Sequence, residues 1–151
     1  MVSGVVLLDA GPLGLVTNPK GSGKTDDCAR WLQSLVSAGV RVLIPEIADY
    51  EIRRELLRAK KAAGLAKLDA LEGAVEYLPI TTAAMQHAAQ LWARARQRGQ
   101  PTAGDESIDA DMILIGQGLT LGEPQFVIAT TNVGHLGRFT SAALWTDITP
   151  Q

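Results

Sequence analysis

The sequence is poor in the residues and runs that mark several common classes of protein. Its single cysteine, Cys28, cannot form an internal disulfide and is consistent with a reducing compartment. No apolar run approaches the roughly 20 residues that a membrane span needs. The first residues lack the basic segment of a secretory signal, and the chain reaches an acid at Asp9. We therefore expect a cytoplasmic protein with no membrane segment.

The chain also has a small net charge and few aromatic residues. The formal net charge of the 151 residues is −2, which excludes nucleic-acid binding through bulk charge alone but leaves room for a local basic strip. With 46% apolar and 20% charged residues, the composition is typical of a compact α/β protein. A chain of this length can bury one core, and we predict a single domain over residues 1–151, without internal repeats.

Aliphatic runs alternate with helical patterns along the chain. Val5 to Leu8 is unbroken and aliphatic, as expected of a parallel strand buried on both faces. Further strands are predicted over 40–44, 75–80, 126–130 and 143–145. Helices are predicted from Asp26 to Gly39, from Pro45 to Gly64, over 65–71, from Thr82 to about Gly99, and from Asp109 to Thr120. This alternation predicts a three-layer α/β/α fold with a parallel sheet of four to five strands.

Two helical patterns make specific predictions about burial. The stripe with Cys28 is apolar, so we interpret this cysteine as a small core residue rather than a nucleophile. Thr81 or Thr82 can cap the helix that begins near Thr82, and its apolar residues Met85, Ala88, Ala89 and Trp92 are predicted to point inward.

The stretch NPKGSGKT, residues 18–25, matches part of a nucleotide-binding loop. Gly23, Lys24 and Thr25 fit the end of the motif G-x-x-x-x-G-K-[ST], whose backbone N–H groups surround phosphates. Asn18 stands where the first glycine belongs, and the loop does not follow a predicted strand directly. We favour a solvated loop that ends in a helix cap.

Oxygen-bearing side chains follow the predicted strands. In an open parallel sheet, ligands bind outside the carboxyl ends of the strands, so residues at these positions converge on one edge. The positions after strands are Asp9, then Glu46, Asp49, Glu51 and Glu55, and finally Thr130, Thr131 and Asn132; Asp109 and Asp111 join them from the first turn of the helix after the loop TAGDES.

Each of these residues also has a simpler explanation. An Asp after a strand often caps the next helix, and an acid in a first helical turn complements the helix dipole, as for Asp109. Glu51 and Glu55 are i, i+4 neighbours that can pair with nearby Arg or Lys. Several carboxylates at one edge would nevertheless repel unless a cation joined them. Hard oxygen ligands without a His or Cys set suit Mg²⁺ or Mn²⁺, which support hydrolysis of a phosphodiester.

The order of four blocks along the chain resembles a known family. LLDAGPL, PEIADYEIRREL, DADMILIGQGL and VIATTNVGHLGRF are similar in order to the PIN-domain nucleases, and among them to the toxin ribonucleases of VapC type. The resemblance runs from Val5 to about Phe139. It implies a metal-dependent endoribonuclease with an RNA substrate, a small antitoxin partner and, by family habit, a homodimer.

The resemblance also implies roles for individual residues. Asp9, Glu51 and Asp111 match the acids that hold the metal. Asn132 falls where many members carry a fourth acid, and we expect it to orient water or substrate. Asp109 is a further metal-ligand candidate that could compensate for the missing charge.

Basic residues near the proposed site suggest how RNA is held. Arg53 and Arg54 follow the predicted acid Glu51 on the same helix, and Thr131 lies in the turn after the fourth predicted strand. We predict that these three residues contact the substrate, although charge runs on helices are more often solvated faces.

Two other functions stay open from the sequence alone. Asn132 in place of an acid favours a non-catalytic PIN-like module that binds RNA or protein. A nucleotide-binding protein that uses Lys24 is the second alternative.

Overall fold

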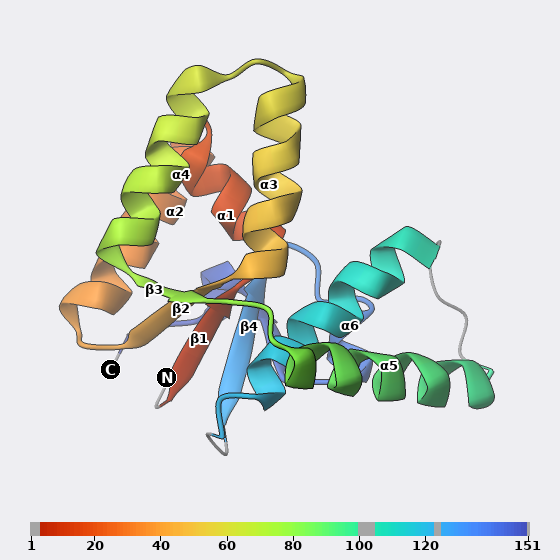
Figure 1. Cartoon of the computed structure of the whole chain (residues 1–151). Helices are drawn as coiled ribbons and strands as arrows, with labels where there is room; N and C mark the ends of the chain where they lie inside the picture. Colours follow the sequence, from red (N-terminus) through yellow and green to blue (C-terminus); the bar gives the residue numbers. More distant parts are fainter. Residues whose placement is uncertain (1–3, 100–104, 123–124, 151) are drawn as a thin grey trace.

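The computed structural model describes residues 4–99, 105–122 and 125–150. Within these ranges, the centre of the fold is a parallel sheet of five strands in the order β3-β2-β1-β4-β5 (Figure 1). The strands are β1 (Val5–Leu8), β2 (Arg41–Pro45), β3 (Glu76–Leu78), β4 (Phe126–Thr130) and β5 (Ala142–Leu144). The predicted parallel sheet is confirmed, with β1 at its centre.

The register of the strands determines which residues meet at the edge of the sheet. Leu7 of β1 pairs with Leu43 of β2, and Leu8 pairs with Ala129 of β4. The residues that follow Leu8 and Ala129 are Asp9 and Thr130, so these two polar side chains lie next to each other at the carboxyl edge. This edge is where the sequence predicts a ligand site.

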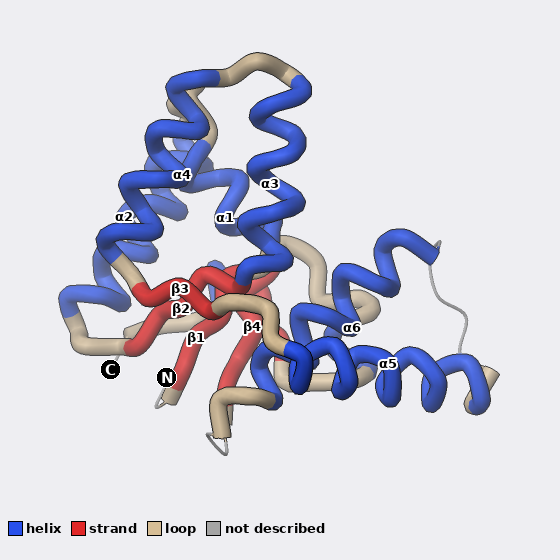
Figure 2. The backbone as a smooth tube through the Cα atoms, viewed as in Figure 1, coloured by secondary structure: helices blue, strands red, loops and turns tan. Residues whose placement is uncertain are grey.

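Helices cover both faces of the sheet. In the described residues they are α1 (Ala10–Thr17), α2 (Gly23–Ser37), α3 (Glu46–Arg58), α4 (Ala62–Ala74), α5 (Thr82–Gln97) and α6 (Asp105–Leu119). Helices α1 to α4 stand together on one side of the strands, and α5 and α6 lie as a pair on the other (Figures 1 and 2). The predicted three-layer arrangement is confirmed.

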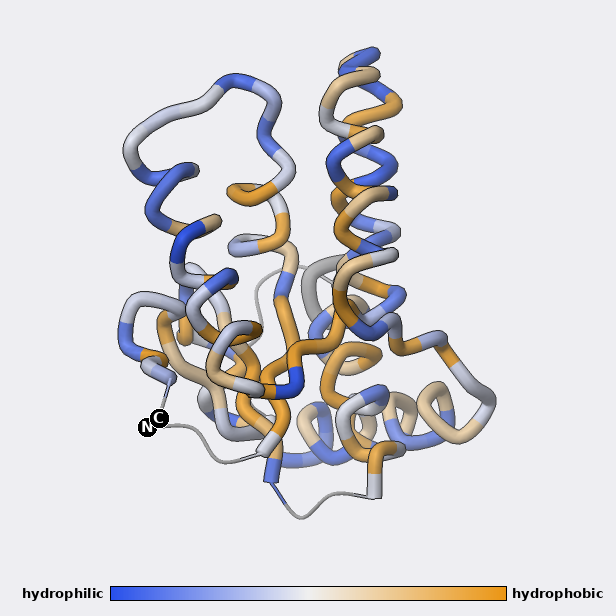
Figure 3. Tube along the Cα trace, turned by 90° about the vertical axis from the view of Figure 1, so that its left-hand side faces the viewer, coloured by the Kyte–Doolittle hydropathy of each residue, from blue (hydrophilic) through white to orange (hydrophobic). Residues whose placement is uncertain are grey.

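The alternation of side chains in β1 builds two separate core layers. Val6 and Leu8 pack into the cluster on the α1–α4 side, whereas Val5 and Leu7 pack into the cluster with α6. The strands accordingly appear mostly hydrophobic at the centre of the fold, whereas hydrophobic and hydrophilic residues alternate along the helices (Figure 3). Each fully buried Leu contributes about 1.5–3 kcal/mol through loss of contact with water, so this strand alone anchors both layers.

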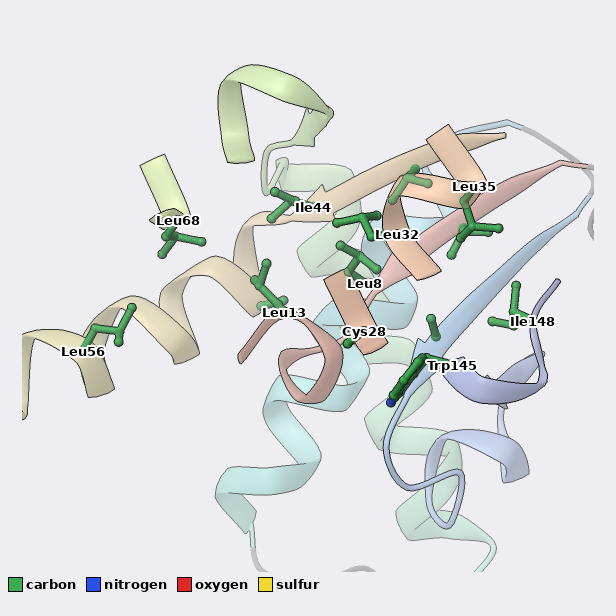
Figure 4. Packing of buried hydrophobic residues seen from close by; sticks show 14 residues of the cluster. Leu8, Leu13, Cys28, Leu32, Leu35, Ile44, Leu56, Leu68, Trp145 and Ile148 are labelled. Atoms are coloured by element: carbon green, nitrogen blue, oxygen red, sulfur yellow. The ribbon is translucent and has the colours of Figure 1, made fainter. Parts of the chain in front are cut away.

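Cys28 lies in the first of these layers. Its side chain is fully buried, and it sits beside Leu8 and Leu13 where α2 and α1 meet β1 (Figure 4). Burial raises the pKa of its thiol to about 12, so the thiolate is not populated at neutral pH. The interpretation of Cys28 as a core residue is confirmed.

Helix α3 ends earlier than the sequence predicts. It stops at Arg58, and Lys60 adopts a left-handed conformation with φ of 56°. The Lys61 amide then donates to the Leu56 carbonyl at 2.9 Å, which satisfies a free carbonyl of the last turn. Gly64, predicted to end the helix, instead lies inside α4, where a Cβ atom would be only 2.6 Å from a methyl group of Leu56. The prediction was wrong because this glycine serves close helix packing rather than a turn.

The buried face of α5 is also shifted from the predicted one. Thr81 caps this helix as expected, its side chain accepting from the Ala84 amide at 3.1 Å. Ala84, Ala88 and Ala95 are buried, whereas Met85 and Trp92 are 45% and 39% exposed. The small residues face α6 because the two helices approach closely. Of the residues predicted to point inward, Ala88 is therefore buried, whereas Ala89 and the larger side chains of Met85 and Trp92 lie at the surface.

Helix α6 begins at Asp105, four residues before the predicted start at Asp109. None of the helices in the described ranges is long and apolar enough to cross a membrane.

Candidate active site

Asp9 follows β1 directly and is the N-cap residue of α1. Its Oδ1 accepts a hydrogen bond from the Ala10 amide at 2.8 Å, and its Oδ2 accepts one from the Thr130 hydroxyl at 2.8 Å. The Asp9 amide donates to the Ala129 carbonyl at 3.0 Å, so the backbone is tied to β4 as well. Burial raises the pKa of the carboxyl despite these two stabilising hydrogen bonds. Asp9 is thus held in one orientation at the edge of the sheet.

Glu51 and Asp111 bring two more carboxylates toward Asp9, from α3 and α6. Burial raises the pKa of Glu51, and the charge of Asp9 raises it further, against an opposing effect of Arg54. Burial, then the charges of Asp9 and Glu51, raise the pKa of Asp111 to about 7. Each pair of the three is therefore close enough for the charges to repel. We call Asp9, Glu51 and Asp111 the carboxylate cluster.

The chemistry of this cluster fits a hard divalent cation. Its donors are carboxylate oxygens, the ligands that Mg²⁺ and Mn²⁺ prefer. Three like charges partly removed from water repel one another, and a cation between them would offset that repulsion. Among the side chains that the structure describes, no three of Asp, Glu, His or Cys lie close enough to coordinate one ion as they stand. The three carboxylates are thus close enough to affect one another's pKa values, but they are not arranged to coordinate a single ion.

Asn132 lies in the turn after β4 and is exposed. The backbone N–H of Asn132 donates to the Thr130 hydroxyl oxygen at 3.2 Å. The side-chain Oδ1 of Asn132 accepts from the backbone N–H of Gly134 at 3.0 Å. The side-chain oxygen therefore stabilises the turn itself. Its predicted role in orienting water or substrate stays a prediction.

Asp109 is exposed and lies apart from the cluster. Together with Met85, Trp92 and Met112 it lines an apolar groove of about 360 Å³ between α5 and α6. Residues two apart on a helix diverge by about 200°, which explains why Asp109 and Asp111 face different surroundings. The structure gives no support to Asp109 as a further ligand.

Arg53, one of the predicted substrate contacts, is engaged in an ion-pair network between α3 and α4. Its guanidinium bonds to Asp49 at 3.1 Å, Asp69 at 2.9 Å and Glu72 at 3.2 Å, and these partners raise its pKa. The Tyr77 hydroxyl also donates to Asp49, at 3.4 Å. This network joins α3 to α4 and β3, so the contacts of Arg53 in this structure are structural ones.

Arg54 and Thr131, the other two predicted substrate contacts, lie near the cluster. The charge of Arg54 lowers the pKa of Glu51, so its guanidinium is close to that carboxylate. Thr131 is exposed and packs over Gly11, where a Cβ atom would be 2.7 Å from its Cγ2. Their predicted contact with a substrate stays a prediction.

Two buried polar residues support the cluster: Thr130, which the sequence placed at the sheet edge without a specific role, and Gln117, which did not stand out in the sequence. Thr130, which bonds Asp9, is 1% exposed, and Gln117 on α6 is fully buried. Gln117 accepts from the Ile47 amide at 3.2 Å and donates to the Leu78 carbonyl at 2.7 Å. It satisfies a first-turn amide of α3 from α6, and so couples the helices that carry Glu51 and Asp111. The sequence signal that could have identified Gln117 is that it is the one polar side chain in the otherwise apolar run MILIGQGL.

The stretch NPKGSGKT, residues 18–25, runs from the end of α1 into the first turn of α2, which begins at Gly23 and not at the predicted Asp26. Ser22 caps α2 by accepting from the Thr25 amide at 3.2 Å, and the Asn18 side chain accepts from the Lys20 amide at 2.9 Å. Lys24 is exposed. The predicted solvated loop that ends in a helix cap is confirmed.

Comparisons with known proteins define the fold further. No protein-family model matches the sequence, and no curated protein matches it either. Solved structures do match. A chain of VapBC2 from Rickettsia felis, bound to a DNA fragment from its promoter, is 16% identical with a TM-score of 0.71, over 93% of this chain and 98% of that one.

Two other structures agree. VapBC-1 from nontypeable Haemophilus influenzae is 15% identical with a TM-score of 0.69, and DNA-bound VapBC from Salmonella typhimurium is 21% identical with a TM-score of 0.63. Each match covers 95% of this chain and 99% of the other. This protein therefore has the fold of the chains that it matches in these VapBC structures, which agrees with the fold that the resemblance in the sequence implies.

Proposed function

We propose that this protein is a Mg²⁺- or Mn²⁺-dependent endoribonuclease and the toxin of a VapBC-type toxin–antitoxin pair. The observation that carries the proposal is the approach of Asp9, Glu51 and Asp111 at the carboxyl edge of the sheet, where burial, and then the charges of Asp9 and Glu51, raise the pKa of Asp111 to about 7. A protein core seldom retains such a cluster without a function, because it costs stability. The fold supports the same proposal.

Different residues of this chain would have different roles at such a site. Asp9 is held by the Ala10 amide and the Thr130 hydroxyl, so one ligand is in place before anything binds. Glu51 and Asp111 come from separate helices and complete the set of carboxylates. Arg54, whose charge lowers the pKa of Glu51, would neutralise a substrate phosphate.

A divalent ion held by these carboxylates would supply a Lewis acid that activates water and stabilises charge on the leaving oxygen of the phosphodiester. Asn132 would lie beside the reacting phosphate as a neutral hydrogen-bonding group. Asp111 would have to give up its proton when the ion binds, so ion affinity should increase with pH up to about neutrality.

The direct test is cleavage of structured RNA by the purified protein. We expect activity with Mg²⁺ or Mn²⁺, none with EDTA, and at least about a hundredfold loss in Asp9→Asn, because metal catalysis supplies several kcal/mol. Asp109→Asn is a matched control, since that carboxylate is exposed and lines another groove. Activity that persists in EDTA would remove metal-dependent hydrolysis.

The proposed partners follow from the same family. The solved VapBC structures are complexes, two of them with DNA. We propose that a small antitoxin, encoded beside this protein, binds it and suppresses its activity, and that the protein itself is a homodimer. Co-purification after co-expression with the neighbouring short reading frame tests the first point, and light scattering of the isolated protein tests the second.

A non-catalytic module is the second candidate function. It is favoured by Asn132, which lacks a charge and uses its Oδ1 within its own turn. Calorimetric titration with Mn²⁺ separates the two functions. A saturable site that disappears in Asp111→Asn supports the enzyme, and the absence of any Mn²⁺ uptake supports the module.

A further inference from the structure

An exposed aromatic ring lies on the helix that carries Glu51. Tyr50 directly precedes Glu51 on α3 and is 55% exposed. The guanidinium of Arg54, four residues later, lies over its ring at 5.1 Å from the centroid. The pair presents a flat, partly apolar surface with one positive charge.

Arg54 connects this pair to the cluster. It stands three residues after Glu51, so the two share one face of α3, and its charge acts on the Glu51 carboxyl. Tyr50, by contrast, makes none of the hydrogen bonds that the structure records for the described side chains of α3. Its ring is therefore available to a molecule that approaches the cluster.

We infer that Tyr50 and Arg54 form a stacking platform for an unpaired nucleobase, next to the phosphodiester that the carboxylate cluster would hydrolyse. This inference rests on the proposed function and adds to it the two residues that would hold a base beside the bond to be cleaved. Bases that are not paired can stack on Tyr and on Arg planes, whereas paired bases in an RNA helix offer no free face.

The chain supplies a matched control for this platform. Trp92 and Arg96 on α5 repeat the same arrangement, with the guanidinium 4.8 Å from the ring centroid and Trp92 39% exposed. This second pair borders the groove of Asp109 rather than the cluster. If any exposed ring beside an arginine contributes to RNA binding, replacing Tyr50 or Trp92 should weaken binding equally. If the platform binds a base, only the replacement of Tyr50 should weaken it.

The test is binding of fluorescein-labelled single-stranded RNA to the full chain, measured by anisotropy in EDTA so that no cleavage intervenes. Tyr50→Ala should weaken binding about five- to tenfold, the lower part of the range for base stacking on an exposed ring. Tyr50→Phe should stay within about twofold of the wild type, because it keeps the ring. Trp92→Ala should bind as the wild type does.

A scan of the RNA identifies the stacked base. Each nucleotide in turn is replaced by an abasic one, and the loss of affinity is compared between the wild type and Tyr50→Ala. The platform predicts one position at which the abasic change weakens the wild type but has no further effect on Tyr50→Ala. Equal losses in both proteins at every position would overturn the inference.

Two other results would also overturn it. One is unchanged RNA affinity in Tyr50→Ala together with an altered oligomeric state in light scattering, which would make the ring part of a protein interface. The other is an equal loss of affinity in Trp92→Ala. Because the binding assay is separate from the cleavage assay, the two proposals can fail independently. RNA binding that depends on Tyr50 can be found in a protein that does not cleave RNA, and cleavage can be found in a protein whose RNA binding does not depend on Tyr50.

Discussion

Replacing Asp111 by asparagine should stabilise the metal-free protein while it removes the proposed activity. The substitution keeps the shape of the side chain and deletes one of the three repelling charges. Asp9 and Glu51 would then face a neutral group, and the cost of burying a third charge would disappear. A residue that reduces stability and supports function is expected at a metal-dependent site.

The size of the effect follows from the pKa. The pKa of Asp111 is raised from 3.8 to about 7. A tenfold change in proton affinity corresponds to about 1.4 kcal/mol, so the full difference would be about 4 kcal/mol. Because the side chain is only partly buried and solvent screens its charge, we expect a gain of about 1–2 kcal/mol.

The pH dependence has a definite sign. A carboxyl whose pKa is higher in the folded protein keeps its proton longer there, so its contribution to stability is greatest below the unfolded value of 3.8 and is lost as the pH rises through about 7. Asparagine does not titrate. The difference between variant and wild type should be close to zero near pH 4 and reach its full size above about pH 7.

Urea unfolding in EDTA, followed by tryptophan fluorescence at a series of pH values, measures this difference. Asp109→Asn on the same helix is the control and should show no such pH-dependent gain. With Mn²⁺ added, the wild type should gain stability by mass action and Asp111→Asn should not. If Asp111→Asn is instead less stable at every pH, the charge of Asp111 is stabilised by its surroundings and the argument from repulsion fails.

Four further substitutions test the supporting structure, each by chemical denaturation. Thr130→Val removes the hydroxyl bonded to Asp9 and should cost about 1.5–3 kcal/mol, whereas an unchanged midpoint would mean that this bond contributes nothing. Gln117→Met leaves two buried backbone groups unpaired and should cost about 2–3 kcal/mol; a loss below about 1 kcal/mol would indicate that water replaces the amide. Gly11→Ala places a Cβ against the threonine after β4 and should cost about 1–3 kcal/mol, and a neutral effect would show that the turn moves freely. Lys60→Gly relieves a left-handed φ of 56° and should stabilise by about 0.5–1 kcal/mol, unless the lysine side chain makes a compensating contact.

Much of the fold could be predicted because its signals are local. The aliphatic run Val5–Leu8 became the central strand, and Thr81 capped α5 as expected. The errors arose where packing overrides a local preference. Gly64 lies within a helix because α4 packs tightly against α3, and Trp92 is exposed because the smaller residues of α5 fit against α6.

The candidate site was harder to predict because its partners are distant in the chain. Asp9 was identified from its place after a strand, but Thr130, which holds it, is 121 residues away. Arg53 and Arg54 are neighbours of the same type, yet the first is bound in an ion-pair network and the second acts on Glu51. A rotation of 100° between successive helical residues separates these two environments, and only the neighbours of α3 reveal which is which.

By itself, the sequence determined the strands, most of the helices and the parallel sheet, because hydrophobic periodicity and caps act over a few residues. It also determined that acids follow the strands. The tertiary structure decided which of those acids meet, since strand order and the rotation of each helix depend on packing between segments that are far apart. It brought Asp111 to Asp9 and left Asp109 at the surface.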